Sequence, residues 1–296
     1  MDNMNDYNNE FVIVTDSTSD LPKGWAEEHN VTVIPMTLII EGKVYRDYPD
    51  ERELSDREFY DIMRRKVLPT TSAINQAEFE EVMDPILNSG RDILFVAVSG
   101  STSCTFSVAG MVGKRLMEKY PGRKVLTVDS LCASIGEGVL VRWCQNWKEQ
   151  GMTIEQVKEM ADREKYHICH FFTVDDLIHV MRSGRATKTT AVMGTLLGIK
   201  PVLRLNDEGL METVEKARGQ KCAFKKITER IEETIADRSE ELIVGHSDCP
   251  DTAEELADMI RRKVGVEKIT ILPIGKICGN QTGAGTLSVF FRGIHR

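Results

Sequence analysis

The sequence predicts an α/β protein of two domains, the first with a parallel sheet and the second with a mixed sheet. In the first half of the chain, apolar strand segments alternate with helical segments, which is typical of parallel sheets with helical crossovers. In the second half, two strand segments flank Asn206 to Gly209 and predict an antiparallel hairpin. The length of 296 residues suits about two domains. We expect domains at 11–160 and 161–296, with a ligand site at their interface.

The elements of the first domain follow from apolar runs and the polar turns that end them. Buried strands are predicted where short apolar runs stop at hydroxyl-rich or charged loops. Helices are predicted where apolar residues recur at helical spacing. The strands are expected at 11–14, 31–40, 93–98 and 124–128, and the helices within 46–66, at 106–120 and at 137–149.

The second domain is expected to combine parallel and antiparallel strands. The predicted helix over 175–182 should stop near Gly184, because glycine commonly ends a helix. The other helices are expected at 153–165, 189–197, 222–236 and 252–264. The strands are expected at 168–174, 200–205, 210–216, 241–245, 268–273 and 287–291.

Composition excludes several classes of partner. The net charge is -8, with 38 basic and 46 acidic residues, so binding to the phosphates of nucleic acid is not expected. The longest apolar runs fall short of the ~20 residues that cross a bilayer, so we expect no stable membrane insertion. The first ten residues are polar and lack the order of a signal peptide. A cytoplasmic location is therefore expected.

The sequence lacks the usual signatures of metal, nucleotide and hydrolase sites. Its seven cysteines form no C-x-x-C pair, and the His167 and His170 pair has no evident further ligands. There is no G-x-x-x-x-G-K-[ST] loop, no G-x-G-x-x-G after the first strand and no G-x-S-x-G elbow. We expect no metal, no cofactor and no kinase or serine-hydrolase chemistry in this chain.

Hydroxyl side chains follow three of the predicted strands. They occur in 15–19, in 99–105 and at Ser130. Because ligands bind outside the carboxyl ends of parallel strands, these side chains should converge on one site. A helix that begins just after Thr105 would add unpaired backbone N–H groups and the positive end of its dipole. The site therefore suits an anion such as a carboxylate.

An ordered set of motifs runs through nearly the whole chain and resembles the DegV family of bacterial proteins. Each motif is weak alone, but the order is specific. The motifs are T-D-S-T-S-D-L-P at 15–22, Thr71-Ser72, Ser103-x-Thr105, Val128-Asp129-Ser130, Arg182-Ser183-Gly184-Arg185, G-I-K-P at 198–201, and the glycine-rich segment 274–285.

This resemblance implies a two-domain DegV-like fold that binds a long-chain fatty acid in a buried apolar tunnel. The carboxylate would be presented to a partner fatty acid kinase, which forms an acyl phosphate for phospholipid metabolism. By motif, Thr71 and Ser103 would bind the carboxylate, with Arg182 and Gln281 in the surrounding polar network. Supporting loops would contribute Asp16, Ser17, Ser72, Thr102, Thr105, Ser130 and Thr282, and possible tunnel residues are Met193, Leu196 and Leu197.

Each of these roles has a structural alternative. Ser103 and Thr71 have hydroxyls of the kind that cap helices and turns. Arg182 falls in the last turn of a predicted helix, where a cation interacts with free carbonyls. The predicted tunnel residues lie on a helix that repeats apolar residues, a pattern that core helices share.

Four positions depart from the family pattern. Gln281 replaces the closing histidine, Cys104 and Thr102 replace the glycine and leucine of L-S-G-T, and Ile74 replaces a proline. Gln281 still donates and accepts hydrogen bonds, but it does not titrate near neutral pH as histidine does. We therefore expect fatty-acid binding to persist while phosphoryl presentation changes, and we expect the side chain of Cys104 to shift the position of the head group.

Two other functions remain open from the sequence. An enzyme acting on an acyl or small carboxylate substrate would use Ser103 or Asp16, although no base is evident beside Ser103. A lipid-responsive interaction protein would change its affinity for a partner when lipid binds. The leading prediction is a non-catalytic binding subunit, because the phosphate would come from the nucleotide of the kinase.

Overall fold

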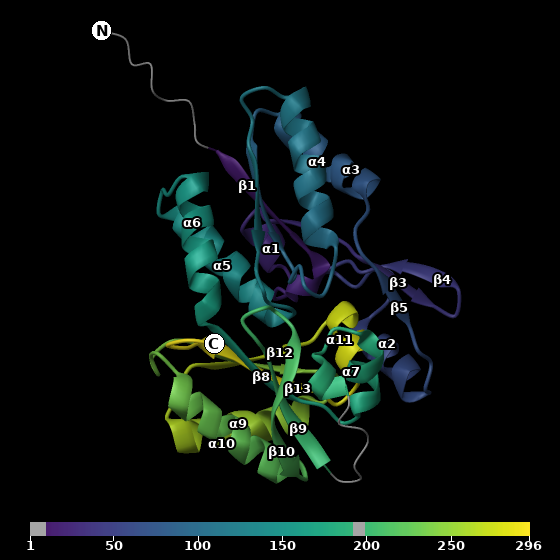
Figure 1. Ribbon diagram of the computed structural model, residues 1–296, viewed down its shortest axis with the longest axis vertical. Helices are drawn as coiled ribbons and strands as arrows, with labels where there is room; N and C mark the ends of the chain where they lie inside the picture. The colour runs from purple at the N-terminus through teal and green to yellow at the C-terminus, as the bar shows by residue number, and fades with distance from the viewer. Residues whose placement is uncertain (1–9, 192–198) are drawn as a thin grey trace.

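The computed structural model describes residues 10–191 and 199–296 and contains a parallel sheet followed along the chain by a mixed one (Figure 1). The first sheet has the order β2-β1-β6-β7, and all of its strands are parallel. Its strands are β1 (Phe11–Asp16), β2 (Thr32–Ile34), β6 (Asp92–Ala97) and β7 (Val125–Asp129). Every residue of β1 is buried, as expected for a parallel sheet covered on both faces.

Two pairs of helices cover the faces of this sheet. Helices α3 (Gln76–Asn88) and α4 (Thr105–Lys119) pack on the face that carries Val12 and Phe95. Helices α5 (Ile135–Glu149) and α6 (Ile154–Glu164) pack on the opposite face. Because side chains alternate along a strand, each strand contributes apolar side chains to the cores on both faces of the sheet. The fold class and the helical crossovers predicted for this half are confirmed.

The predicted single strand over 31–40 is wrong. The chain forms β2 and then β3 (Thr37–Ile40), which pair in different sheets. Pro35 lies between them, and a proline has no backbone N–H to continue a strand ladder. β3 instead forms a small antiparallel sheet in the order β4-β3-β5, with β4 (Lys43–Arg46) and β5 (Thr70–Ser72).

The second sheet has six strands in the order β10-β9-β8-β13-β11-β12. Only β11 and β12 pair in parallel, so the sheet is mixed as predicted. The predicted hairpin is confirmed, and the side chain of Asn206 accepts hydrogen bonds from the N–H groups of Glu208 and Leu210 in its turn. The strands are β8 (Ile168–Thr173), β9 (Ile199–Leu205), β10 (Met211–Arg218), β11 (Leu242–His246), β12 (Ile269–Pro273) and β13 (Leu287–Arg292).

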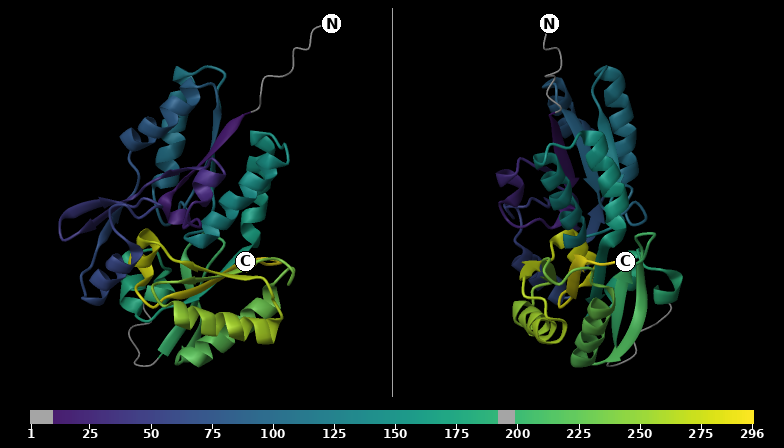
Figure 2. Two further views of the ribbon diagram at one scale, coloured as in Figure 1. Left: turned by 180° about the vertical axis from the view of Figure 1, so that it is seen from behind. Right: turned by 90° about the vertical axis from the view of Figure 1, so that its left-hand side faces the viewer.

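The two faces of the second sheet have different neighbours. Helices α9 (Gln220–Thr234) and α10 (Pro250–Val264) cover one face, at the end of the molecule away from the first sheet (Figure 2). Residues Phe171 and Phe291 point into that core. Their strand neighbours alternate to the other face, where Phe172 and Phe290 border a cavity. The sheet therefore has helices α9 and α10 on one face, and the cavity and the first half of the chain on the other.

The remaining helices are short. They are α1 (Trp25–Glu28), α2 (Asp56–Arg64), α7 (Leu177–Ser183), α8 (Lys188–Ala191) and α11 (Lys276–Thr282). Helix α7 ends at Gly184, which has a left-handed φ of 69°, as predicted. The predicted helix over 189–197 is described only as α8, because 192–198 lie outside the described residues. None of the helices in the described ranges is long and apolar enough to span a membrane.

Helix α11 is anchored to the first half of the chain. The buried Lys276 ammonium lies 3.0 Å from a carboxylate oxygen of Asp47 and 3.0 Å from one of Asp56. The Tyr60 hydroxyl donates to the carbonyl oxygen of Ile274 over 2.7 Å, just before the helix. These contacts join segments more than 200 positions apart. The proposed boundary between residues 160 and 161 remains a prediction.

The close packing of α5 on the first strand-end loop predicts the effect of a single methyl group. A Cβ added at Gly138 would overlap the carbonyl oxygen of Ser19. We expect Gly138→Ala to destabilise the fold by about 1–3 kcal/mol, because backbone must move to relieve the overlap. Urea denaturation, read as the change in free energy of unfolding, measures this.

Gly110→Ala is the matched control. Gly110 lies inside α4, and a Cβ there meets no atom of the described residues within 4 Å. This substitution should stabilise the protein by about 0.5–1 kcal/mol, since alanine loses less backbone entropy in a helix. Equal effects of the two substitutions would contradict the packing described for Gly138.

Candidate functional site

A cavity of about 840 Å³ is bordered by both halves of the chain. This volume is within the range of roughly 300–1,000 Å³ usual for small-molecule sites. The first half contributes β5 and the loop between β6 and α4, while the second contributes α11 and the free face of the six-stranded sheet. The anchoring of α11 therefore also determines the shape of the cavity.

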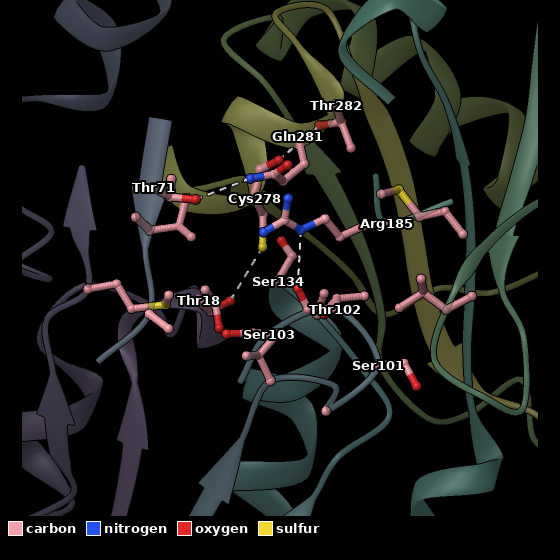
Figure 3. A pocket seen from close by; sticks show the side chains of 18 of the residues that line it. Thr18, Thr71, Ser101, Thr102, Ser103, Ser134, Arg185, Cys278, Gln281 and Thr282 are labelled. Atoms are coloured by element: carbon pink, nitrogen blue, oxygen red, sulfur yellow. Dashed lines mark hydrogen bonds between the residues drawn. The ribbon is translucent and has the colours of Figure 1, made fainter. Parts of the chain in front are cut away.

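Polar side chains from distant segments line one part of the cavity (Figure 3). Gln281, near the end of α11, donates from Nε2 to Thr71 Oγ1 over 3.4 Å. Since the Thr71 oxygen accepts this bond, its own hydroxyl proton is available to a ligand. Ser103 and Arg185 line the same cavity, and Figure 3 shows the Arg185 side chain extending into this polar group.

Ser103 makes a local hydrogen bond and also lines the cavity. Its Oγ accepts a hydrogen bond from the N–H of Thr105 over 3.3 Å and lies 2.9 Å from Thr105 Oγ1. It thus satisfies a backbone group at the start of α4, the structural role considered from the sequence, while it also lines the cavity. The positive end of the α4 dipole lies beside it, which favours an anion there.

The two arginines of the R-x-G-R turn lie in different surroundings. Arg182 is exposed and is not among the described residues that line the cavity, whereas Arg185 is. The reason is the left-handed turn at Gly184, which ends α7 and redirects the chain after Arg182. Arg185 donates from Nε to the carbonyl oxygen of Thr102 over 3.1 Å and from Nη1 to that of Ser183.

The supporting residues fall into two groups. Ser72, Thr102 and Thr282 line the cavity, whereas the other four are buried outside its wall. Each of these four makes internal contacts. Asp16 accepts from the N–H of Val98 over 3.1 Å, Ser17 accepts from that of Met36 over 3.1 Å, Thr105 contacts Ser103, and Ser130 donates to the carbonyl of Cys132 over 3.3 Å.

A buried acidic pair behind the wall was not predicted from the sequence. The Thr18 hydroxyl contacts Asp16 Oδ1 and lies 2.7 Å from Glu137 Oε2. This hydroxyl has one proton, which it can donate to only one of the two carboxyl groups at a time. Burial raises the pKa of Asp16, and burial followed by the charge of Asp16 raises the pKa of Glu137 well above its usual value. These groups support Thr18, which lines the cavity.

The rest of the cavity is mainly apolar. All four substituted family positions border the cavity: Thr102 and Gln281 line its polar part, Ile74 is buried against it and Cys104 is exposed at its edge. The predicted tunnel residues Met193, Leu196 and Leu197 lie outside the described residues. The described apolar lining consists of Met36, Ala73, Ile74, Val98, Val108, Ala133, Phe172, Leu205, Met211, Ile274, Ile277 and Phe290.

The described lining of the cavity carries little charge. Among its described residues, Arg185 is the only one with a permanent charge, and no Asp, Glu or Lys lies with it. Within 10–191 and 199–296, no three His, Cys, Asp or Glu side chains are grouped so that they could hold a metal ion. An uncompensated guanidinium among hydroxyls is suited to an anionic group on an otherwise apolar ligand.

Comparison with known proteins identifies the family. A family model described as "Uncharacterised protein, DegV family" matches residues 10–293. A DegV domain-containing protein of Clostridium perfringens is 38% identical over 284 residues, which cover 96% of this chain and 97% of the relative.

Solved structures of similar proteins have the same fold. A Thermus thermophilus protein, described as a fatty-acid-binding DegV family protein, matches with a TM-score of 0.84 and 29% identity over 96% of this chain and 100% of the other. A Streptococcus agalactiae protein, described in the same terms, matches with a TM-score of 0.84 and 27% identity over 95% and 98% of the two chains. The similarity in sequence and the similarity in fold both extend over nearly the whole chain. The chain belongs to the DegV family.

Proposed function

We propose that this protein binds a long-chain fatty acid, with the carboxylate among the polar side chains and the acyl chain along the apolar part of the cavity. The observation that carries this proposal is Arg185, the one permanently charged residue in the described lining, beside hydroxyl groups at one part of a mainly apolar cavity. The Thermus thermophilus and Streptococcus agalactiae proteins, described as binding fatty acids, support it.

The two parts of the ligand have different energetic roles. Burying about fifteen methylene groups at ~0.8 kcal/mol each provides roughly 12 kcal/mol before the costs of association. Each hydrogen bond to a charged carboxylate contributes about 1.5–3 kcal/mol. The acyl chain therefore determines most of the affinity, and the head group determines how the ligand is oriented.

In this proposal the carboxylate accepts hydrogen bonds from Ser103, Thr71 and Arg185. The Thr71 hydroxyl is oriented by the bond from Gln281, so Gln281 acts through Thr71 rather than by charge. Two N–H groups of Arg185 donate to carbonyls in the described residues, and the guanidinium has five in all. The remaining donors suit a carboxylate, which accepts at two oxygens.

We further propose that the bound carboxylate is presented to a partner fatty acid kinase in the cytoplasm. Several cavity-lining residues next to Ser103 are exposed, among them Ser101 and Cys104, so a partner could reach this end of the cavity. A carboxylate oxygen would attack the γ-phosphorus of the nucleotide of the kinase, and the bond to the leaving nucleoside diphosphate would break. The product is an acyl phosphate, a precursor for phospholipid synthesis.

The two other functions left open by the sequence make different predictions. An acyl-processing enzyme would turn over its substrate without a kinase. A lipid-responsive interaction protein would change its affinity for a partner without phosphoryl transfer. Ser103 has hydroxyl and backbone contacts but, among the described residues, no hydrogen-bonded histidine or carboxylate that could act as a base, which favours binding over catalysis.

The arginine pair provides a direct test of the head-group site. Arg185→Gln should weaken binding of hexadecanoate about tenfold or more near neutral pH, because charged hydrogen bonds to the carboxylate are lost. Displacement of a fluorescent fatty acid measures the Kd.

Arg182→Gln is the matched control, because it removes the same charge from an exposed position outside the described lining of the cavity. Its Kd should stay within about twofold of that of the unmodified protein. A larger loss of affinity in Arg182→Gln than in Arg185→Gln would show that the carboxylate lies elsewhere.

Phosphoryl presentation is tested with a purified fatty acid kinase, ATP and the fatty-acid-loaded protein. We expect formation of acyl phosphate, trapped as the hydroxamate, only when both proteins are present. Ser103→Ala should reduce the rate about tenfold or more, because the carboxylate loses a charged hydrogen bond that fixes its position.

Omitting the kinase separates the alternatives in the same assay. Turnover of an acyl ester by this protein alone, lost in Ser103→Ala, would support the enzyme. Binding to the kinase that depends on lipid but yields no acyl phosphate would support the lipid-responsive interaction protein.

A further inference from the structure

The loop that carries Ser103 is folded tightly around Ser99. Ser99 is fully buried and lies just after β6. Its carbonyl oxygen accepts hydrogen bonds from the N–H of Thr102 over 3.0 Å and from that of Ser103 over 3.1 Å, and the Thr102 hydroxyl donates to it over 2.9 Å. Because the N–H of Ser103 is bonded directly to Ser99, a displacement of Ser99 also displaces Ser103.

The side chain of Ser99 connects this loop to the second half of the chain. Its hydroxyl donates over 3.1 Å to the carbonyl oxygen of Gly209, which lies in the turn between β9 and β10. The same oxygen accepts from the N–H of Ser101 over 3.3 Å. Neither Ser99 nor Gly209 is among the described residues that line the cavity. The contact therefore joins the two halves of the chain without being part of the lining itself.

Gly209 leaves no room for a side chain beside Ser99. Its φ is 76°, in the left-handed region that glycine adopts readily, and an added Cβ would overlap the Ser99 hydroxyl. The turn is itself held in shape, because the N–H of Gly209 donates to the carbonyl oxygen of Asn206 over 2.8 Å and the Asn206 side chain accepts from two further N–H groups. A well-bonded turn of the second sheet is thus in close contact with Ser99.

A second contact holds the same loop nearer to Ser103. Arg185 donates from Nε to the carbonyl oxygen of Thr102 over 3.1 Å. The second half of the chain therefore holds the loop at two points, Ser99 and Thr102, and Ser103 follows directly. In the proposed site Ser103 and Arg185 donate to one carboxylate, so their relative position must be correct to within about 0.5 Å.

We propose that Ser99 and the β9–β10 turn position Ser103 for the carboxylate of the bound fatty acid. The inference rests on the proposed fatty-acid function and adds a positioning residue to it, since Ser99 acts through Ser103 and does not contact the ligand. The contact orients the head group, whereas burial of the acyl chain provides most of the binding free energy. Loss of the contact should therefore change the hydrogen bonds of the carboxylate while the acyl chain stays bound.

The test uses hexadecanoate labelled with ¹³C at the carboxyl carbon, because the chemical shift of that carbon responds to the hydrogen bonds of the carboxylate. Gly209→Ala should move the resonance of the bound acid in the same direction as Ser103→Ala, since the added methyl group displaces Ser99. Ser99→Ala removes the hydroxyl without adding bulk and should move it likewise. The Kd should rise less than about fivefold in either variant, because the bond from Ser103 is distorted and not removed.

Combining the substitutions shows whether the effect passes through Ser103. In protein that already carries Ser103→Ala, the addition of Gly209→Ala should cause little further movement of the resonance. Two substitutions that act on the same contact are not additive, whereas independent ones are.

Gly42→Ala is the matched control. Gly42 lies in the turn between β3 and β4 and has a similar φ of 83°, but an added Cβ meets no atom of the described residues within 4 Å. This substitution introduces the same backbone strain without pressing on a neighbour. The resonance and the Kd should match those of the unmodified protein.

The possible outcomes separate this inference from the proposed function. A resonance that stays in place in Ser99→Ala would overturn the inference alone, and this variant decides the matter if Gly209→Ala does not fold. An equal movement in Gly42→Ala, or a full effect of Gly209→Ala in the Ser103→Ala background, would also overturn it. If hexadecanoate does not bind the unmodified protein, or its resonance does not respond to Ser103→Ala, the proposed function or its head-group site is wrong.

Discussion

The buried ion pairs of Lys276 are the interaction on which the site depends. Burial alone lowers the pKa of this ammonium, but Asp47 and Asp56 outweigh that effect and raise it. Removing a buried charge from its partners costs several kcal/mol, so the start of α11 stays docked against the first half of the chain. Gln281, on the next turns of the helix, is thereby brought to Thr71. One electrostatic anchor thus holds this wall of the cavity in place and positions Gln281 beside Thr71.

Much of the fold could be predicted because the strands are short runs of apolar residues and the helices repeat apolar residues at helical spacing. β1, β6 and the hairpin around Asn206 follow from such local patterns. Helix α3 was missed although Asn75 and Glu78 form a capping box that the sequence displays. Helix α11 has little local signal, with Gly, Asn and Thr in seven residues, and its ion pairs are contacts between distant segments. Such contacts do not appear in a local pattern.

The site was predictable where a motif fixes one residue and less so where it offers two. Thr71, Ser103 and Gln281 border the cavity as the motifs suggested, although binding of a carboxylate to them stays a prediction. The R-x-G-R turn contains both Arg182 and Arg185, and only the left-handed glycine between them determines which one lines the cavity. Glu137 gave no signal of its own, because its burial beside Asp16 is a property of the folded chain.

If the cavity holds a long-chain fatty acid, the acid should be recovered with the purified recombinant protein. Mass spectrometry of an organic extract, calibrated against protein concentration, measures this. Near-stoichiometric long-chain fatty acid in the extract is the expected result. A protein that is empty when purified and also fails to bind added fatty acids would contradict it. The cavity beside Arg185 would then serve a different anion.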